Sequence, residues 1–133
     1  MASLRCRLIY AADFNYTASK LGGGAVRDAL GEFEQLILLA LVRLGDDAYG
    51  VPIRGEIESR TGRSVSAGAV YTALERLQGR GFVSSRWGDP TPERGGKRKK
   101  FYALEPLGRR AIARSQEALK RMARGIQPKL SRS

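Results

Sequence analysis

The sequence predicts a mainly α-helical fold with one small β-hairpin. Apolar residues recur at helical spacing in four stretches of the chain, and strand-like runs occur only between the third and fourth of these stretches. A chain of 133 residues with 42% hydrophobic content can bury one modest core. We therefore expect a single domain with tails, and no second domain.

The N-terminal residues 1–24 show no sustained periodicity and end in the triplet Gly22-Gly23-Gly24. We expect this segment to be an extension that is disordered or loosely docked. The alternative is a functional arm that reaches for a partner.

The first helix is predicted from Phe33 onward. Its inward-facing series is Phe33, Leu36, Ile37, Ala40, Leu41 and Leu44. Leu38, Leu39 and Val42 add apolar surface on another side, so we expect this helix to be covered by its own domain and also by a second subunit. Gly45-Asp46-Asp47 ends the helix and offers capping oxygens to the next one.

The second helix is short. Pro52 suits a position in its first turn, where the missing N–H costs nothing. Ile53 and Ile57 face inward together, and Thr61-Gly62 closes the segment.

The third helix is predicted to begin after Ser66, whose hydroxyl can accept hydrogen bonds from the amides of the first turn. Its apolar stripe is Val70, Ala73, Leu74 and Leu77. At about 100° per residue, the opposite face carries Gly68, Thr72 and Glu75, flanked by Tyr71 and Arg76. That face is free to meet a partner.

A hairpin follows the third helix. Residues 82–87 and 99–104 are strand candidates, and residues 88–96 between them are too rich in Pro and Gly to be regular. The tip and its flank carry a run of positive charge, Arg94, Lys97, Arg98, Lys99 and Lys100. We expect Trp87 and Phe101 to fill the core between the sheet and the helices, and not to stack on a ligand.

Pro106 opens the last helix, which we expect to run to residue 126. One side is close to a heptad repeat and the other sides are basic. A two-stranded sheet leaves little of the domain to cover this narrow stripe, so a partner helix is its expected cover. The predicted dimerisation residues are Leu38, Leu39, Val42, Ile112, Ser115, Leu119, Met122 and Ile126.

Composition limits the chemistry. The net charge of +11 and the pI near 10.5 favour a polyanionic partner, nucleic acid before a membrane surface. The chain has no histidine and a single cysteine, Cys6, which excludes a His/Cys zinc site, a disulfide framework and any His-dependent catalytic dyad. Carboxylate-only or lysine-based catalysis stays open, but the sequence nominates no active site.

We therefore expect neither an enzyme nor a cofactor or metal. A lone cysteine suits a reducing cytosol, and neither a signal peptide nor a membrane-spanning stretch is recognisable, so we expect a soluble cytoplasmic protein with no membrane partner.

Three helices, a two-stranded wing and a closing helix are the layout of a winged helix-turn-helix with a C-terminal dimerisation helix. The expected organisation is an N-terminal extension over residues 1–24, a winged helix-turn-helix domain over 25–105, a dimerisation helix over 106–126 and a basic, fraying tail over 127–133. The small and polar start of the third helix suits close approach to base edges.

The candidate DNA-binding residues come from this helix and from the wing, where clustered cations next to a recognition helix suit phosphate contact. They are Ser66, Ala67, Gly68, Tyr71, Thr72, Arg76, Arg94, Lys97, Arg98 and Lys99. Three alternatives stay open. Tyr71 could donate its hydroxyl to a phosphate, which is the favoured interpretation, or could cap the edge of the core. Gly68 and Ala69 could be small only to let the helix pack closely on its neighbour. Glu75 could accept a hydrogen bond from a cytosine amino group, although pairing with a neighbouring arginine is the favoured interpretation.

From about residue 31 to residue 126 the chain resembles the PadR family of bacterial transcription regulators, especially its short members with a single C-terminal helix. The matching stretches are residues 36–41, 48–50, 66–72, 74–77, 81–84, 95–102 and 104–108. The resemblance implies a homodimer that binds an inverted-repeat operator, usually as a repressor, with the first and last helices at the dimer interface. It implies recognition by Ser66, Gly68, Tyr71 and Thr72, and wing contact by Lys97 and Arg98.

The chain departs from the family pattern in two ways. Glu105 stands where threonine is common, which weakens the expected helix cap, and the N-terminal extension has no family counterpart. Some family members bind flat aromatic effectors through a tryptophan on the dimer helix. Here the only tryptophan is Trp87, on the wing, so a small-molecule effector stays open but unidentified.

We favour a DNA-binding regulator, with double-stranded DNA as partner and a pseudo-palindromic operator. The alternative is a non-specific nucleic-acid-binding protein, architectural or RNA-binding, for which charge alone would suffice.

Overall fold

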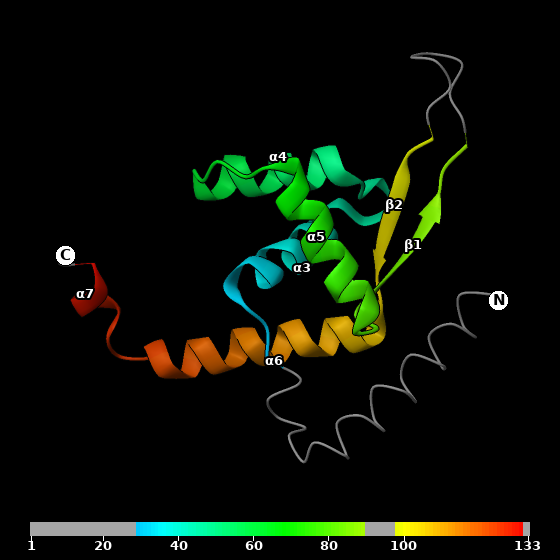
Figure 1. The fold of residues 1–133 in the computed structure, drawn as a ribbon. Helices are drawn as coiled ribbons and strands as arrows, with labels where there is room; N and C mark the ends of the chain where they lie inside the picture. The colour runs from blue at the N-terminus through cyan, green and yellow to red at the C-terminus, as the bar shows by residue number, and fades with distance from the viewer. Residues whose placement is uncertain (1–28, 90–97, 132–133) are drawn as a thin grey trace.

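The computed structural model describes residues 29–89 and 98–131 (Figure 1). Helices α3 (Glu32–Leu44), α4 (Gly50–Thr61) and α5 (Ala67–Gly79) pack together, and a short 3-10 turn, η1 (Gly45–Asp47), joins the first two. Strands β1 (Val83–Trp87) and β2 (Lys100–Leu104) form the hairpin, and α6 (Pro106–Ala123) and α7 (Gln127–Leu130) follow. This mainly helical fold with one hairpin confirms the predicted fold class. The expected N-terminal extension over residues 1–24 lies outside the described residues.

Local signals in the sequence set the helix boundaries. The carboxylate of Glu34 accepts a hydrogen bond from the amide of Gly31 at 3.0 Å, which holds the start of α3. Gly62 ends α4 in the left-handed conformation, with φ of 74°, and its amide donates to the carbonyl of Glu58 at 2.9 Å. Ser66 caps α5 as predicted, since its hydroxyl accepts from the amide of Ala69 at 3.1 Å.

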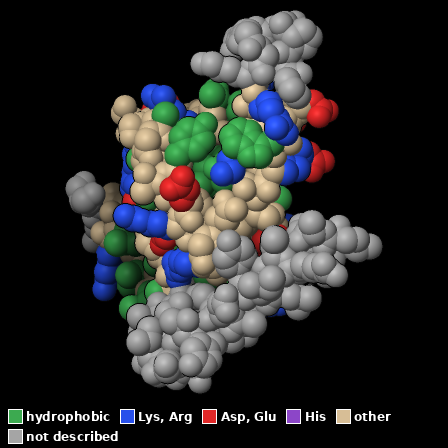
Figure 2. Space-filling view, turned by 45° about the vertical axis from the view of Figure 1, so that its right-hand side comes forward, with side chains coloured by type: hydrophobic (Ala, Val, Ile, Leu, Met, Phe, Trp, Pro, Cys, Tyr) green, Lys and Arg blue, Asp and Glu red, His purple; other side chains and the backbone are tan. Residues whose placement is uncertain are grey.

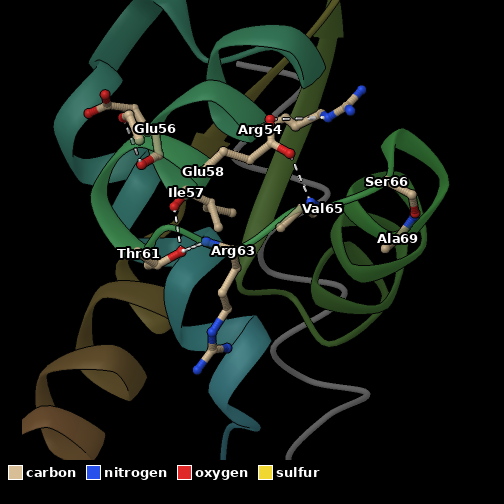
Figure 3. Close-up of polar contacts among 10 residues, drawn as sticks. Arg54, Glu56, Ile57, Glu58, Thr61, Arg63, Val65, Ser66 and Ala69 are labelled. Carbon is tan, nitrogen blue, oxygen red and sulfur yellow. Dashed lines mark hydrogen bonds and ion pairs between the residues drawn. The ribbon is translucent and has the colours of Figure 1, made fainter.

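The turn between α4 and α5 is fixed by side chains of α4 (Figure 3). The carboxylate of Glu58 accepts a hydrogen bond from the amide of Val65 at 2.8 Å. The hydroxyl of Thr61 donates to the carbonyl of Ile57 at 2.6 Å and accepts from the amide of Arg63 at 3.2 Å. These contacts set the angle at which α5 leaves α4.

One core lies between the helices and the base of the hairpin. Its fully buried large side chains are Ile37, Leu38, Ile53, Val70, Leu74, Leu77 and Phe82. α6 passes so close to the start of the hairpin that a Cβ on Gly108 would collide with the backbone carbonyl of Phe82. Among the described residues, no helix is long and apolar enough to span a bilayer.

The hairpin is antiparallel, with Val83 paired to Leu104 at its base and Trp87 paired to Lys100 at its outer end. A bridge between Tyr49 and Phe101 ties the hairpin to the segment that leads into α4. Figure 1 shows strands β1 and β2 standing beside α4 and α5.

The prediction that Trp87 fills the core is wrong. Its side chain is 56% exposed, because it lies four residues beyond Val83 on the strand, past the end of the helical core. Phe101 is half-buried and packs edge-on against Tyr49, with the ring centroids 5.4 Å apart.

The C-terminal end also differs from the prediction. α6 stops at Ala123 and not at residue 126, because Arg124 is extended and Gly125 has a φ of 84°, a conformation that favours glycine. Residues 127–130 of the tail, which we expected to fray, form the short helix α7.

Candidate nucleic-acid interface

The first turns of α5 present an open face. Val70, Ala73, Leu74 and Leu77 are buried, whereas the residues at the start of the helix and on its opposite side are exposed: Ser66, Ala67, Gly68, Tyr71, Thr72, Glu75 and Arg76. A Cβ on Gly68 would meet no atom within 4 Å. Packing among the described residues therefore does not account for this glycine.

Tyr71 is held against the start of α4. Its side chain is 43% exposed, and its hydroxyl lies where a Cβ on Gly50 would stand. Only glycine at position 50 leaves the phenol ring in this place. Gly50 therefore has a packing role against Tyr71 that the sequence alone did not reveal.

Glu75 and Arg76 are both exposed on α5. Neither takes part in the ion pairs between described residues, which are Arg54–Glu58, Arg60–Glu56, Arg63–Glu32, Arg80–Glu34 and Arg121–Glu117. The expected pairing of Glu75 with a neighbouring arginine is therefore not present among these residues. Both side chains are exposed in the second half of α5.

Three cations of the hairpin lie within the described residues: Arg98 and Lys99 are exposed and Lys100 is half-buried. The guanidinium of Arg98 donates to the carbonyl of Gly88 at 3.0 Å and so closes the base of the loop. The ammonium of Lys99 lies 3.5 Å from the hydroxyl of Tyr49 and 4.6 Å from the centroid of its ring. Arg94 and Lys97 lie outside the described residues.

A cleft of about 490 Å³ separates α5 from the hairpin, and we call it the α5–hairpin cleft. Its lining residues are Tyr49, Val51, Tyr71, Glu75, Trp87, Arg98, Lys99, Lys100 and Tyr102. Figure 2 shows hydrophobic and basic side chains gathered on this face of the molecule, with a carboxylate among them. The cleft therefore combines aromatic, cationic and acidic groups.

Tyr102 is the buried member of this lining, only 3% exposed. Burial raises the pKa of its phenol above the ordinary value, and the neighbouring Tyr71 and Glu75 add to the rise. Tyr102 therefore stays neutral at neutral pH.

The predicted dimerisation residues divide into two groups. Leu38 and Ile112 are 0% and 5% exposed within the subunit, so a partner cannot cover them, and we remove them from the candidate surface. They belong to the core because they point from α3 and α6 into the subunit. The remaining residues are exposed or half-buried: Leu39, Val42, Ser115, Leu119, Met122 and Ile126.

Part of α6 has no cover from the described residues. Leu119 and Met122 are 56% and 79% exposed. A shallow groove of about 460 Å³ runs between the start of α3 and α6, with Leu30, Ser115 and Leu119 among its lining residues. The side-chain amide of Gln116 donates to that of Gln35 at 3.0 Å and so ties the two helices together beside the groove.

Three packed helices, a two-stranded hairpin and a closing helix define the winged helix-turn-helix class of DNA-binding regulators. A family model, that of the transcriptional regulator PadR-like family, matches residues 38–114. The chain belongs to this family. The matched range includes α5 and both strands of the hairpin.

Solved structures share the fold. A PadR family transcription regulator from Clostridium difficile matches with a TM-score of 0.64 and 23% identity, over 75% of this chain and 99% of that one. A transcriptional regulator from Clostridium thermocellum matches with a TM-score of 0.58 and 26% identity, over 71% and 89%. Bacillus subtilis PadR in complex with operator DNA matches with a TM-score of 0.54 and 23% identity, over 63% and 46%. No curated protein matches the chain.

Proposed function

We propose that this transcription regulator is a homodimer that binds a pseudo-palindromic operator and acts as a repressor. The main support for the proposal is the open face of α5, where Gly68 and Thr72 are exposed and no packing in the described part of the chain requires the glycine. This face adjoins the cations at the outer end of the hairpin, which line the α5–hairpin cleft together with Tyr71 and Glu75 of α5. The operator complex of Bacillus subtilis PadR supports DNA as the partner.

In this proposal the two elements divide the work of binding. The first turns of α5 enter the major groove, where Gly68 lets the backbone approach the bases and Thr72 contacts their edges. Arg98 and Lys99 contact phosphates, together with Arg94 and Lys97 from outside the described residues. Phosphate contacts supply affinity, and the contacts of α5 supply sequence preference.

The dimer is the second part of the proposal. The exposed apolar side chains of α6, Leu119 and Met122, need a cover, and a second copy of α6 offers the same surface in return. A two-fold dimer would place the two copies of α5 about 34 Å apart, one turn of DNA.

A non-specific nucleic-acid-binding protein is the second candidate. The net charge of +11 favours it, because charge alone supplies affinity for any polyanion. This candidate gives no role to the open face of α5.

Competition binding separates the two candidates. A labelled operator fragment is bound to the protein at fixed salt and displaced by unlabelled operator or by bulk genomic DNA. Sequence-specific regulators prefer their operator by roughly a thousandfold or more. A preference of only a few-fold would favour the non-specific candidate.

A further inference from the structure

The α5–hairpin cleft contains an excess of positive charge. Arg98, Lys99 and Lys100 line it, and none of them takes part in an ion pair between described residues. Lys99 lies over the ring of Tyr49, and Lys100 lies 5.6 Å from the ring centroid of Trp87. Three cations without acidic partners in this part of the structure suit a ligand that carries more than one negative charge, such as a phosphate.

The same cleft offers exposed aromatic surface. Trp87 is 56% exposed and Tyr71 is 43% exposed, from opposite elements of the cleft, the hairpin and α5. Exposed aromatic faces of this kind stack on planar rings, and nucleobases stack on them whatever their identity. This surface suits a ligand that has a ring as well as a phosphate.

Glu75 sets a third requirement for a ligand of the α5–hairpin cleft. Its carboxylate lines the cleft and has no ion-pair partner among the described residues. A carboxylate repels a ligand that is only a chain of phosphates, but it accepts hydrogen bonds from ring N–H and amino groups. Guanine carries two such donors side by side, which match the two oxygens of one carboxylate.

We propose that the α5–hairpin cleft binds a free nucleotide, with guanine as the favoured base. The phosphate lies among Lys99, Lys100 and Arg98, the base stacks on Trp87 or Tyr71, and Glu75 accepts from its N–H groups. The cleft volume of about 490 Å³ falls within the range of small-molecule sites.

Nucleotide and DNA exclude each other at this site, because the cleft is bounded by the two elements that contact DNA in the proposed function. The competition rests on that function, whereas the nucleotide site does not. The nucleotide would therefore release the protein from its operator.

Trp87 makes the site directly observable, because it is the only tryptophan of the chain. Full-length protein without DNA is titrated with guanosine monophosphate while Trp87 fluorescence is recorded. We expect saturable quenching. Guanosine, which lacks the phosphate, and inorganic phosphate, which lacks the base, should each bind at least about tenfold more weakly.

Three variants locate the binding. Lys99→Gln, and Lys99→Gln with Lys100→Gln, should each weaken the nucleotide by about tenfold or more, and Glu75→Gln should reduce the preference for guanosine over adenosine monophosphate. Lys129→Gln on α7 removes the same charge far from the cleft and should leave the titration unchanged. Quenching that survives the double lysine variant would overturn the assignment.

A second arm separates the free nucleotide from DNA. Operator DNA that quenches Trp87, with guanosine monophosphate inert at millimolar concentration, would show that the cleft belongs to DNA alone and would overturn the proposal while leaving the proposed function intact. Failure of the proposed function appears elsewhere, as a lack of operator preference in the competition assay without nucleotide.

Discussion

At the scale of single residues, a substitution of Gly68 distinguishes most clearly between an effect on the stability of the fold and an effect on DNA binding. A glycine in a helix costs about 0.5 to 1 kcal/mol relative to alanine, and a Cβ at position 68 meets no atom within 4 Å. Gly68→Ala should therefore stabilise the fold by about 0.5 kcal/mol. The same methyl group would stand between α5 and the bases, so operator affinity should fall.

Gly55→Ala is the matched control, because Gly55 is also an exposed helical glycine with open space around it, on α4. Urea denaturation and operator titration measure both quantities for each variant. A gain in stability with unchanged operator affinity for Gly68→Ala would remove α5 from the recognition surface.

Arg98 and Lys99 test the role of the hairpin. Replacing both with glutamine should weaken binding to all DNA sequences alike and flatten the salt dependence by roughly 0.9 for each phosphate that the variant no longer binds. Arg109→Gln with Lys129→Gln removes the same charge elsewhere on the surface. If the salt slope of the hairpin variant equals that of this control pair, the hairpin cations are only solvated.

The raised pKa of Tyr102 predicts that the stability of the fold depends on pH. Burial raises the pKa of its phenol in the folded state, so the folded chain holds this proton more tightly than the unfolded chain. The resulting stability is fully present below about pH 10, the ordinary tyrosine pKa, and is lost as the pH rises through the higher folded value. Relative to Tyr102→Phe, the wild-type protein should lose stability in alkaline urea titrations; parallel curves for the two proteins would contradict this.

At the scale of elements, the sequence predicted the helix caps, helix ends and buried faces that depend on residues close together in the chain. The cap at Ser66, the end of α4 at Gly62 and the inward stripe of α5 follow from spacing and residue type, and the structure confirms them. Each of these depends on interactions within about one helical turn.

Interactions between segments that are far apart in the chain could not be predicted from the sequence. The packing of Tyr71 against Gly50 brings together residues of two helices. The bridge between Tyr49 and Phe101 joins the segment before α4 to the hairpin. For the same reason Tyr49 and Val51 were missed as cleft residues. The exposure of Trp87 depends on how far the hairpin extends beyond the core, which periodicity does not encode.

The same distinction explains the errors in the dimerisation surface. Leu38 and Ile112 have the apolar character of an interface, and only the packing of α3, α6 and the hairpin shows that one subunit buries them. The break after Ala123 was visible in the sequence as Gly125, a residue that ends helices by its positive φ.

At the scale of the whole molecule, Leu119 tests the proposed dimer. Leu119 is 56% exposed in the single subunit, so Leu119→Asp should leave the fold intact while placing a charge in the seam between two copies of α6. We expect a monomer in sedimentation, with operator affinity reduced because only one half-site is engaged.

Arg110→Asp, an exposed position on α6 outside the apolar stripe, controls for the added negative charge and should remain dimeric. A dimer that survives Leu119→Asp would place the interface on another surface. Circular dichroism of both variants shows whether the fold is retained.

In the proposed function, a symmetric pair of α5 helices reads DNA sequence. Selection of bound DNA from a random pool by the full-length protein tests it most directly, because one experiment reports both preference and symmetry. We expect an enriched inverted repeat whose half-site centres lie about 10 base pairs apart. A pool that stays random after repeated selection, or an enriched site without two-fold symmetry, would contradict it.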